Sequence, residues 1–150
     1  YAADSRIGFL NIQKAVSSTK EWKKNFEKFK ANFTKEKQRI KLREKKLKKM
    51  LDNLNKTSLV TKPELKKKQE NQFRKEKIDF ERYVQDQNAE FGKQEKEMTQ
   101  KILVKMMKVI KKIGEEKKYT MILEQKVVLY HDKGNDLTSI ATRAYDRANK

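Results

Sequence analysis

The sequence predicts a mainly helical α+β protein, in which a small β body carries a long antiparallel coiled-coil helical hairpin arm. Apolar residues recur at seven-residue spacing through the middle of the chain, and short β-prone runs occur only near its two ends. We therefore divide the chain into a first body segment (1–17), the arm (18–118) and a second body segment (119–150). The tip of the arm is expected at 55–63, and its base, 98–118, is expected to pack into the body.

The arm is predicted from an antiparallel heptad seam. A capping box at Ser18 and Glu21 should start the first helix, and Pro63 is well placed to open the second one. Because both helices rise equally per residue, facing residues should have numbers that sum to about 117 to 120. In the first helix every seventh residue from Phe26 to Leu54 is apolar. The second position of the heptad seam lies halfway between these residues and becomes polar near the middle of the helix; it is occupied by Trp22, Phe29, Glu36, Arg43 and Met50. The predicted apolar pairs are Phe26–Phe91, Phe33–Val84, Ile40–Phe80, Leu47–Phe73 and Leu54–Leu65.

The body is predicted from the segments on either side of the arm. Residues 6–12 favour a first strand, with one helical turn after it. Residues 119–123 and 127–130 favour two further strands joined as a β-hairpin. The second helix of the arm is expected to run from Glu64 to about Lys118, with Gly114 ending its apolar pattern. Asp136 is a suitable N-cap for a final helix over 137–148.

Such a body is too small to be stable alone, so we expect the chain to associate through its sheet edges and through the surface of Met98–Ile113. The helix over Met98–Ile113 is apolar on more than one face, which is typical of a helix covered by several neighbours. The residues expected in this oligomer body are Ile7, Phe9, Ile102, Met106, Val109, Ile113, Ile122 and Val128.

The net charge of +18 is unevenly distributed. Residues 20–68 hold nineteen basic and six acidic residues, a net +13, whereas residues 69–118 hold thirteen and ten, a net +3. Repulsion among the basic residues of 20–68 would be relieved by an acidic or polyanionic partner, which favours a binding function. From the charge alone, a solvated lysine-rich face without a partner is about equally compatible with the sequence. The candidates for electrostatic contacts are Lys45, Lys46, Lys48, Lys49, Lys62, Lys66, Lys67 and Lys68. Apolar residues off the seam that could touch an unfolded chain are Leu42, Leu51, Leu59, Val60, Ile78 and Tyr83.

Catalytic and cofactor chemistry finds no support in the sequence. There is no cysteine, no phosphate-binding glycine loop and only one histidine, His131, which follows a β-prone run. Glu115 and Glu116 are adjacent and should point to different sides of a helix. We therefore expect neither an enzyme nor a metal or cofactor site. The longest apolar runs are too short to cross a membrane.

Two segments carry a resemblance to a known family. Ile7–Ile12 (Ile-Gly-Phe-Leu-Asn-Ile) and Tyr119–Ile140, on either side of a highly charged helical hairpin, resemble the Skp (OmpH-like) family of periplasmic outer-membrane-protein chaperones. The resemblance implies a homotrimer with a β-barrel shared by three chains. It also implies a periplasmic location, with a signal peptide removed ahead of residues 1–4.

The function implied is that of an ATP-independent holdase, which keeps unfolded outer-membrane β-barrel proteins from aggregating in a cavity between basic arms. Anionic lipid or lipopolysaccharide is a further expected partner. The alternative is a basic coiled-coil protein that binds nucleic acid non-specifically. It is disfavoured because the basic residues show no stacking platform and no recognised nucleic-acid-binding module. Attachment to a membrane surface through the basic tip ranks last, because Leu59 and Val60 offer only a small apolar insert.

Overall fold

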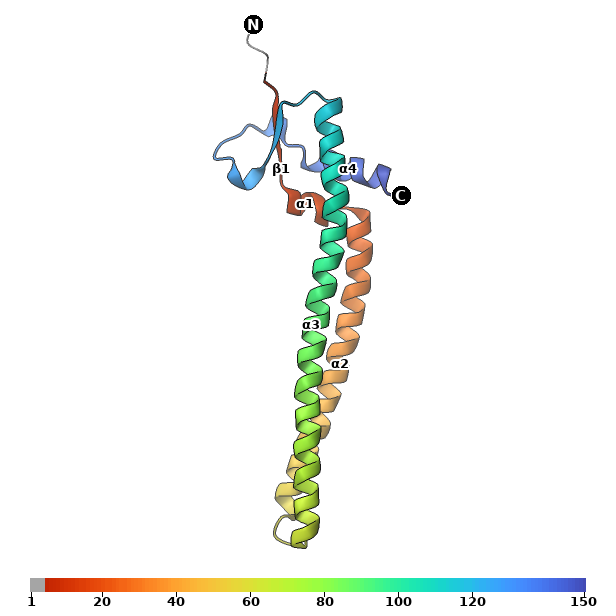
Figure 1. Ribbon diagram of the computed structural model, residues 1–150, viewed down its shortest axis with the longest axis vertical. Coiled ribbons are helices and arrows are strands. Elements are labelled where there is room, and N and C mark those ends of the chain that lie inside the picture. The colour runs from red at the N-terminus through yellow and green to blue at the C-terminus, as the bar shows by residue number, and fades with distance from the viewer. Residues whose placement is uncertain (1–4) are drawn as a thin grey trace. The chain divides into compact units, whose positions relative to one another are not determined.

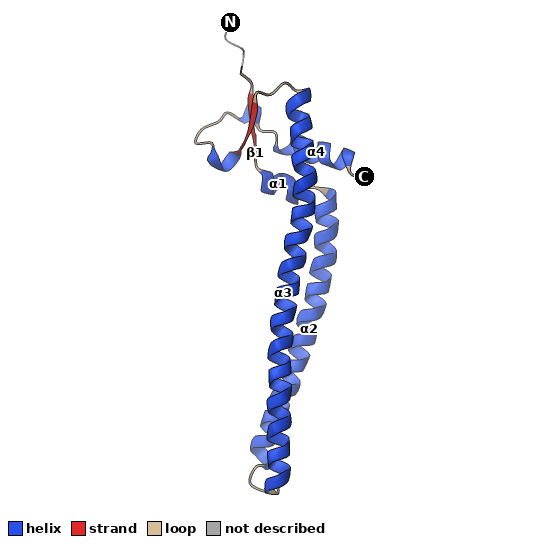
Figure 2. Cartoon of the chain, viewed as in Figure 1, coloured by secondary structure: helices blue, strands red, loops and turns tan. Residues whose placement is uncertain are grey.

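The computed structural model describes residues 5–150. The expected removal of a signal peptide ahead of residues 1–4 concerns a part of the chain outside the described residues. Helices dominate, and the strands are confined to two short segments (Figures 1 and 2). In chain order the elements are β1 (Ile7–Leu10), α1 (Ile12–Ser17), α2 (Lys20–Thr57), α3 (Pro63–Glu116), β2 (Met121–Glu124), the 3-10 turns η1 (Gln125–Val127) and η2 (Lys133–Asn135), and α4 (Thr138–Ala148).

The chain forms two compact units. The first, which we call the body, comprises the chain up to Lys28 together with Glu95–Lys150, and the second, which we call the hairpin, is Phe29–Gln94.

Within the hairpin, α2 and α3 lie side by side and are joined by the short turn after Thr57 (Figure 1). The amides of Val60 and Thr61 donate to the Thr57 carbonyl at 3.1 and 3.0 Å, which closes the last turn of α2. Pro63 opens α3, as predicted, because a first-turn position needs no amide donor.

The seam has the predicted orientation but a slightly different pairing. The ring of Phe91 packs edge-on against both Phe29, at 5.7 Å between centroids, and Phe33, at 5.2 Å. The prediction had placed Phe33 opposite Val84. Helical side chains lean toward the N-terminus of their own helix, so in an antiparallel pair they meet partners slightly further along than equal rise suggests.

The same displacement is visible near the turn. Leu54 lines a groove with Gln69 and Gln72, and the predicted partner Leu65 is half exposed. The polar seam position Glu36 is only 8% exposed. Its carboxylate accepts hydrogen bonds from the hydroxyl of Tyr83 and, at 3.3 Å, from the guanidinium of Arg39.

In the body, β1 and β2 form a parallel two-stranded sheet with Ile7 opposite Met121 and Leu10 opposite Glu124. The other edge of β1 is also used, because Phe9 bridges Asp136 and its carbonyl accepts the Leu137 amide at 2.8 Å.

The prediction of a strand over 127–130 is wrong. The chain enters η1 directly after β2, and within the described residues β2 is the only strand that pairs with β1. Strand propensity needs a partner edge, and Leu129 and Tyr130 are almost fully exposed.

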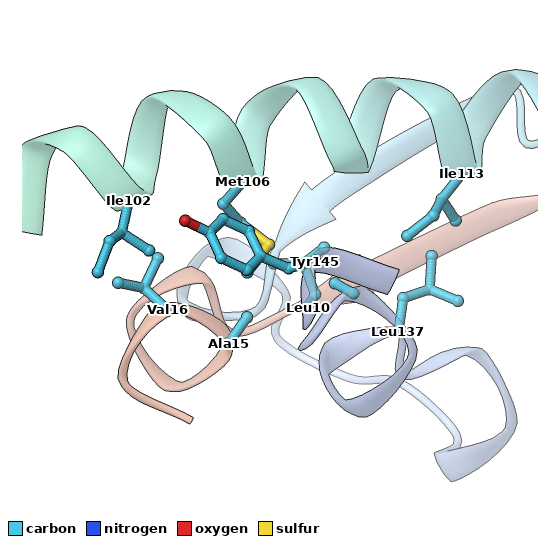
Figure 3. Close-up of a cluster of buried hydrophobic side chains, with 9 residues drawn as sticks. Leu10, Ala15, Val16, Ile102, Met106, Ile113, Leu137 and Tyr145 are labelled. Atoms are coloured by element: carbon cyan, nitrogen blue, oxygen red, sulfur yellow. The ribbon is translucent and has the colours of Figure 1, made fainter. Parts of the chain in front are cut away.

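The base of α3 packs against the rest of the chain's own body, so part of the surface that was assigned to association is covered within one chain. Figure 3 shows Ile102, Met106 and Ile113 pointing from α3 toward side chains of β1, α1 and α4. The buried residues that they meet are Leu10, Ala15, Val16, Leu137, Ala141 and Tyr145.

Three helix ends differ from the predictions. Thr19, not Ser18, caps α2, because its hydroxyl accepts the Trp22 amide at 3.1 Å. Glu21 does not reach back to complete a capping box but bonds to Lys105 and Tyr145.

In the body, α3 continues through Gly114 and ends at Glu116, two residues before the predicted end near Lys118. Its last turn is a Schellman motif in which the Tyr119 amide donates to the Gly114 carbonyl at 2.9 Å and the Lys118 amide to that of Glu115 at 3.3 Å. Lys118 takes the left-handed conformation, with φ 54°. Asp136 accepts the Thr138 amide at 2.9 Å, so it supports the start of α4 as expected, although the helix begins one residue later than predicted.

Candidate functional site

The part of the hairpin nearest its turn carries all of the hairpin's excess positive charge. Residues 37–68, which we call the turn half, contain thirteen basic and three acidic residues, a net +10. The remaining hairpin residues, 29–36 and 69–94, contain seven basic and seven acidic residues, a net charge of zero. A field of this strength attracts acidic partners before contact, and salt screens it over about 8–10 Å.

The eight candidate lysines all lie in the turn half, and seven of them are exposed. Lys66 alone is partly covered. Within residues 5–150, none of the eight pairs with a carboxylate at ion-pair distance. Their ammonium groups therefore face solvent and can meet an external anion without first breaking an internal pair.

Exposed apolar side chains are interspersed with these lysines. Leu59 and Val60 form the turn itself and are 97% and 85% exposed, respectively, while Leu42 and Leu51 project from α2. Leu42 lies in a shallow groove whose sides are formed by Lys41, Lys45 and Lys48. Leu65, which the sequence assigned to the seam, joins this exposed set because its predicted partner lies elsewhere.

Tyr83 lies outside the turn half and is partly covered. Its hydroxyl donates to Glu36, and the guanidinium of Arg43 lies over its ring at 4.5 Å. The hydrogen bond to the Glu36 carboxylate raises the pKa of Tyr83, because that bond favours the neutral phenol. Ile78 is exposed but lies outside the turn half.

The residues expected in an oligomer body fall into two groups. Phe9, Ile102, Met106 and Ile113 are buried inside the chain's own core, and Val109 and Ile122 pack against that core. Only Ile7 is exposed, and Val128 is partly so.

A second exposed apolar set lies on β2 and in the segment that follows it up to Tyr130, which the sequence marks only by its β propensity. Its members are Met121, Leu123, Val127, Leu129 and Tyr130. The edge of β2 away from β1 pairs with no other strand among the described residues.

His131, the one histidine of the sequence, contacts neighbouring residues of the body. His131 packs its ring against Phe9 at 3.8 Å between centroids, and its Nδ1 lies 3.0 Å from the Asp132 carbonyl. Within the described part of the chain, no three histidine, aspartate or glutamate residues cluster as metal ligands would. In that same part, the helices lack an apolar stretch long enough to cross a membrane.

Comparisons with known proteins identify the family of the chain and a solved structure with the same fold. A family model described as "Outer membrane protein (OmpH-like)" matches residues 6–144. Since the match covers most of the sequence, the chain belongs to this OmpH-like family.

A crystal structure of a proposed outer membrane chaperone (OmpH-like) from Caulobacter crescentus has a similar fold, with a TM-score of 0.86. The alignment covers 99% of this chain and 88% of the other, at 14% sequence identity, so the likeness concerns the fold alone. No curated protein matches the chain. Membership of the OmpH-like family supports a chaperone role, and this family is not known for catalysis.

Proposed function

We propose that the protein is an ATP-independent holdase that binds unfolded outer-membrane β-barrel proteins through the turn half of the hairpin. The observation that carries the proposal is the concentration of a net +10 within residues 37–68, together with exposed apolar side chains at and beside the turn. Membership of the OmpH-like family and the fold shared with a proposed outer membrane chaperone are consistent with it.

The binding mechanism follows from the two kinds of side chain. The unpaired lysines draw in acidic segments of a client over long distances, but each exposed charge pair contributes only about 0.2–1 kcal/mol. Leu42, Leu51, Leu59 and Val60 then contact apolar segments over small areas. Many weak contacts of both kinds hold a client without imposing a structure on it, and the client can leave without ATP hydrolysis.

We further propose that three chains assemble into a homotrimer with a shared β-barrel, located in the periplasm. The exposed apolar set around β2 and the unused edge of that strand support this assembly. A trimer would place three hairpins around one cavity and multiply their contacts with a single client. OmpH-like chaperones are typically periplasmic, and anionic lipid or lipopolysaccharide is a further proposed partner.

The test compares two variants with equal loss of charge. In the first, Lys45, Lys46, Lys48 and Lys49 are changed to glutamine. The matched control makes the same change at four exposed lysines in the part of the hairpin without net charge, Lys30, Lys35, Lys75 and Lys93. Each is added to a urea-solubilised outer-membrane β-barrel protein at dilution, and aggregation is followed by light scattering.

We expect the turn-half variant to lose most of its ability to prevent aggregation and the control to retain it. If both variants fully protect the client, lysine attraction does not drive binding. Gel-shift assays with duplex DNA at physiological salt examine the alternative function. Tight DNA binding without protection of the client would favour the nucleic-acid-binding protein instead.

A further inference from the structure

A second cationic site lies in the body, separate from the hairpin. An open groove of about 1000 Å³ is bordered by the first turns of α2, the middle of α3's body segment and the last turns of α4. Seven basic and two acidic residues line it, a net +5. The groove could not be predicted from the sequence, because its walls come from three segments that are far apart in the chain.

The cations come in two regular rows. Lys20, Lys24 and Lys28 recur every four residues on α2, and Arg143 and Arg147 do so on α4. Residues four apart share one face of a helix, so each row presents its charges to the groove.

Both acidic residues of the groove already have partners. The carboxylate of Glu21 accepts from the Lys105 ammonium at 2.9 Å and from the Tyr145 hydroxyl at 2.5 Å. These donors, the tyrosine first, lower the pKa of Glu21 below its ordinary value, against the opposing effect of partial burial. Asp146 accepts the Lys20 backbone amide at 2.9 Å, so its charge reduces the local excess without pairing with a side-chain cation.

The two rows themselves stay unneutralised. Among the described residues, no carboxylate lies within ion-pair distance of Lys24, Lys28, Arg143 or Arg147. Like charges spaced four apart on a helix destabilise it, and here two such rows line one concavity. An anionic ligand would relieve this repulsion.

We propose that this groove binds a ligand with clustered phosphoryl groups. Arginine presents its donors as a planar fork that matches two phosphate oxygens, and lysine adds flexible point charges around it. The groove is far larger than a single phosphate, and its size is that of sites for whole small molecules. The ligand class is therefore a compact polyphosphate or a phosphorylated head group, bound independently of the client.

The test uses inorganic pyrophosphate as the probe and calorimetry at about 0.15 M salt, where the Debye length is about 8 Å. The groove variant carries Lys24→Gln, Arg143→Gln and Arg147→Gln. The matched control carries Lys108→Gln, Lys126→Gln and Lys133→Gln, three exposed body lysines outside the groove. Circular dichroism of both variants checks that they fold.

We expect saturable binding of pyrophosphate to the wild-type chain, weakened by about tenfold or more in the groove variant and by less than about twofold in the control. Equal weakening in both variants would mean diffuse attraction to a cationic surface and would overturn the proposal, as would unsaturable binding to the wild type.

Co-sedimentation with vesicles of phosphatidic acid in phosphatidylcholine then identifies the source of the phosphoryl groups. Loss of vesicle binding in the groove variant alone, with wild-type binding displaced by pyrophosphate, assigns the groove to lipid head groups. Vesicle binding that is unchanged in the groove variant assigns it to soluble polyphosphates. Because the variant leaves the turn half intact, client protection should stay at the wild-type level in either case.

Discussion

Replacing Tyr145 by phenylalanine removes one hydroxyl from the tightest polar cluster of the body. The ring is fully buried, and its hydroxyl donates to Glu21, whose carboxylate also holds Lys105. The substitution keeps the packing of the ring and leaves Glu21 with Lys105 as its remaining side-chain donor. Hydrogen bonds to charged groups contribute about 1.5–3 kcal/mol, so we expect a loss of about 2 kcal/mol in the free energy of unfolding.

The measurement is urea unfolding of both proteins at equal concentration, followed by circular dichroism and by the fluorescence of Trp22, which packs against the body core. The pH dependence separates this hydrogen bond from a packing defect. Because the folded-state pKa of Glu21 is depressed, its contribution is present above the unfolded pKa and is lost as pH falls through the folded value.

The difference in stability between wild type and Tyr145→Phe should therefore be full at about pH 7 and should shrink toward about pH 2. A double-mutant cycle with Glu21→Gln and Tyr145→Phe should show a coupling energy that corresponds to a stabilising interaction between the two side chains. A loss that is the same at both pH values, or one below about 0.5 kcal/mol at neutral pH, would refute the reasoning.

Three further predictions concern single positions. Gly8→Ala should destabilise the body by about 1–3 kcal/mol in thermal unfolding, because a Cβ there would lie 2.7 Å from Cδ1 of Leu137; a melting temperature equal to wild type would contradict this. Lys118→Gly should raise stability by about 1 kcal/mol, since glycine adopts the left-handed conformation at φ 54° without strain, and a decrease would count against the Schellman ending. Tyr83→Phe should weaken the hairpin by about 1–2 kcal/mol and speed amide exchange around Glu36, because the nearly buried carboxylate loses a donor; unchanged exchange would argue against that hydrogen bond.

The hairpin could be predicted because its signals are local. Heptad spacing identifies both helices, and Pro63 marks the start of the second. The contacts of Phe33 and Leu54 were harder to predict, since they depend on how side chains lean and not only on helix rise.

The body was predicted less well because its contacts join distant segments. The strands β1 and β2 lie before and after the whole hairpin in the sequence. No local pattern determines that they pair in parallel. The run over 127–130 has strand propensity, but among the described residues it pairs with no strand.

The same distinction holds for the candidate sites. The excess charge of the turn half follows from counting residues along the sequence. The roles of Tyr145 and Arg143 do not, because their neighbours on α2 are more than a hundred positions away in the chain. The proposed trimer remains a prediction that rests on the exposed apolar set around β2.

Native mass spectrometry of the chain, alone and after mixing with a urea-diluted outer-membrane β-barrel protein, tests the central claim most directly. We predict a trimer that takes up one unfolded client and keeps it in solution, and that releases it as salt is raised. A monomer or dimer that leaves the client to aggregate would contradict both the proposed assembly and the proposed holdase function.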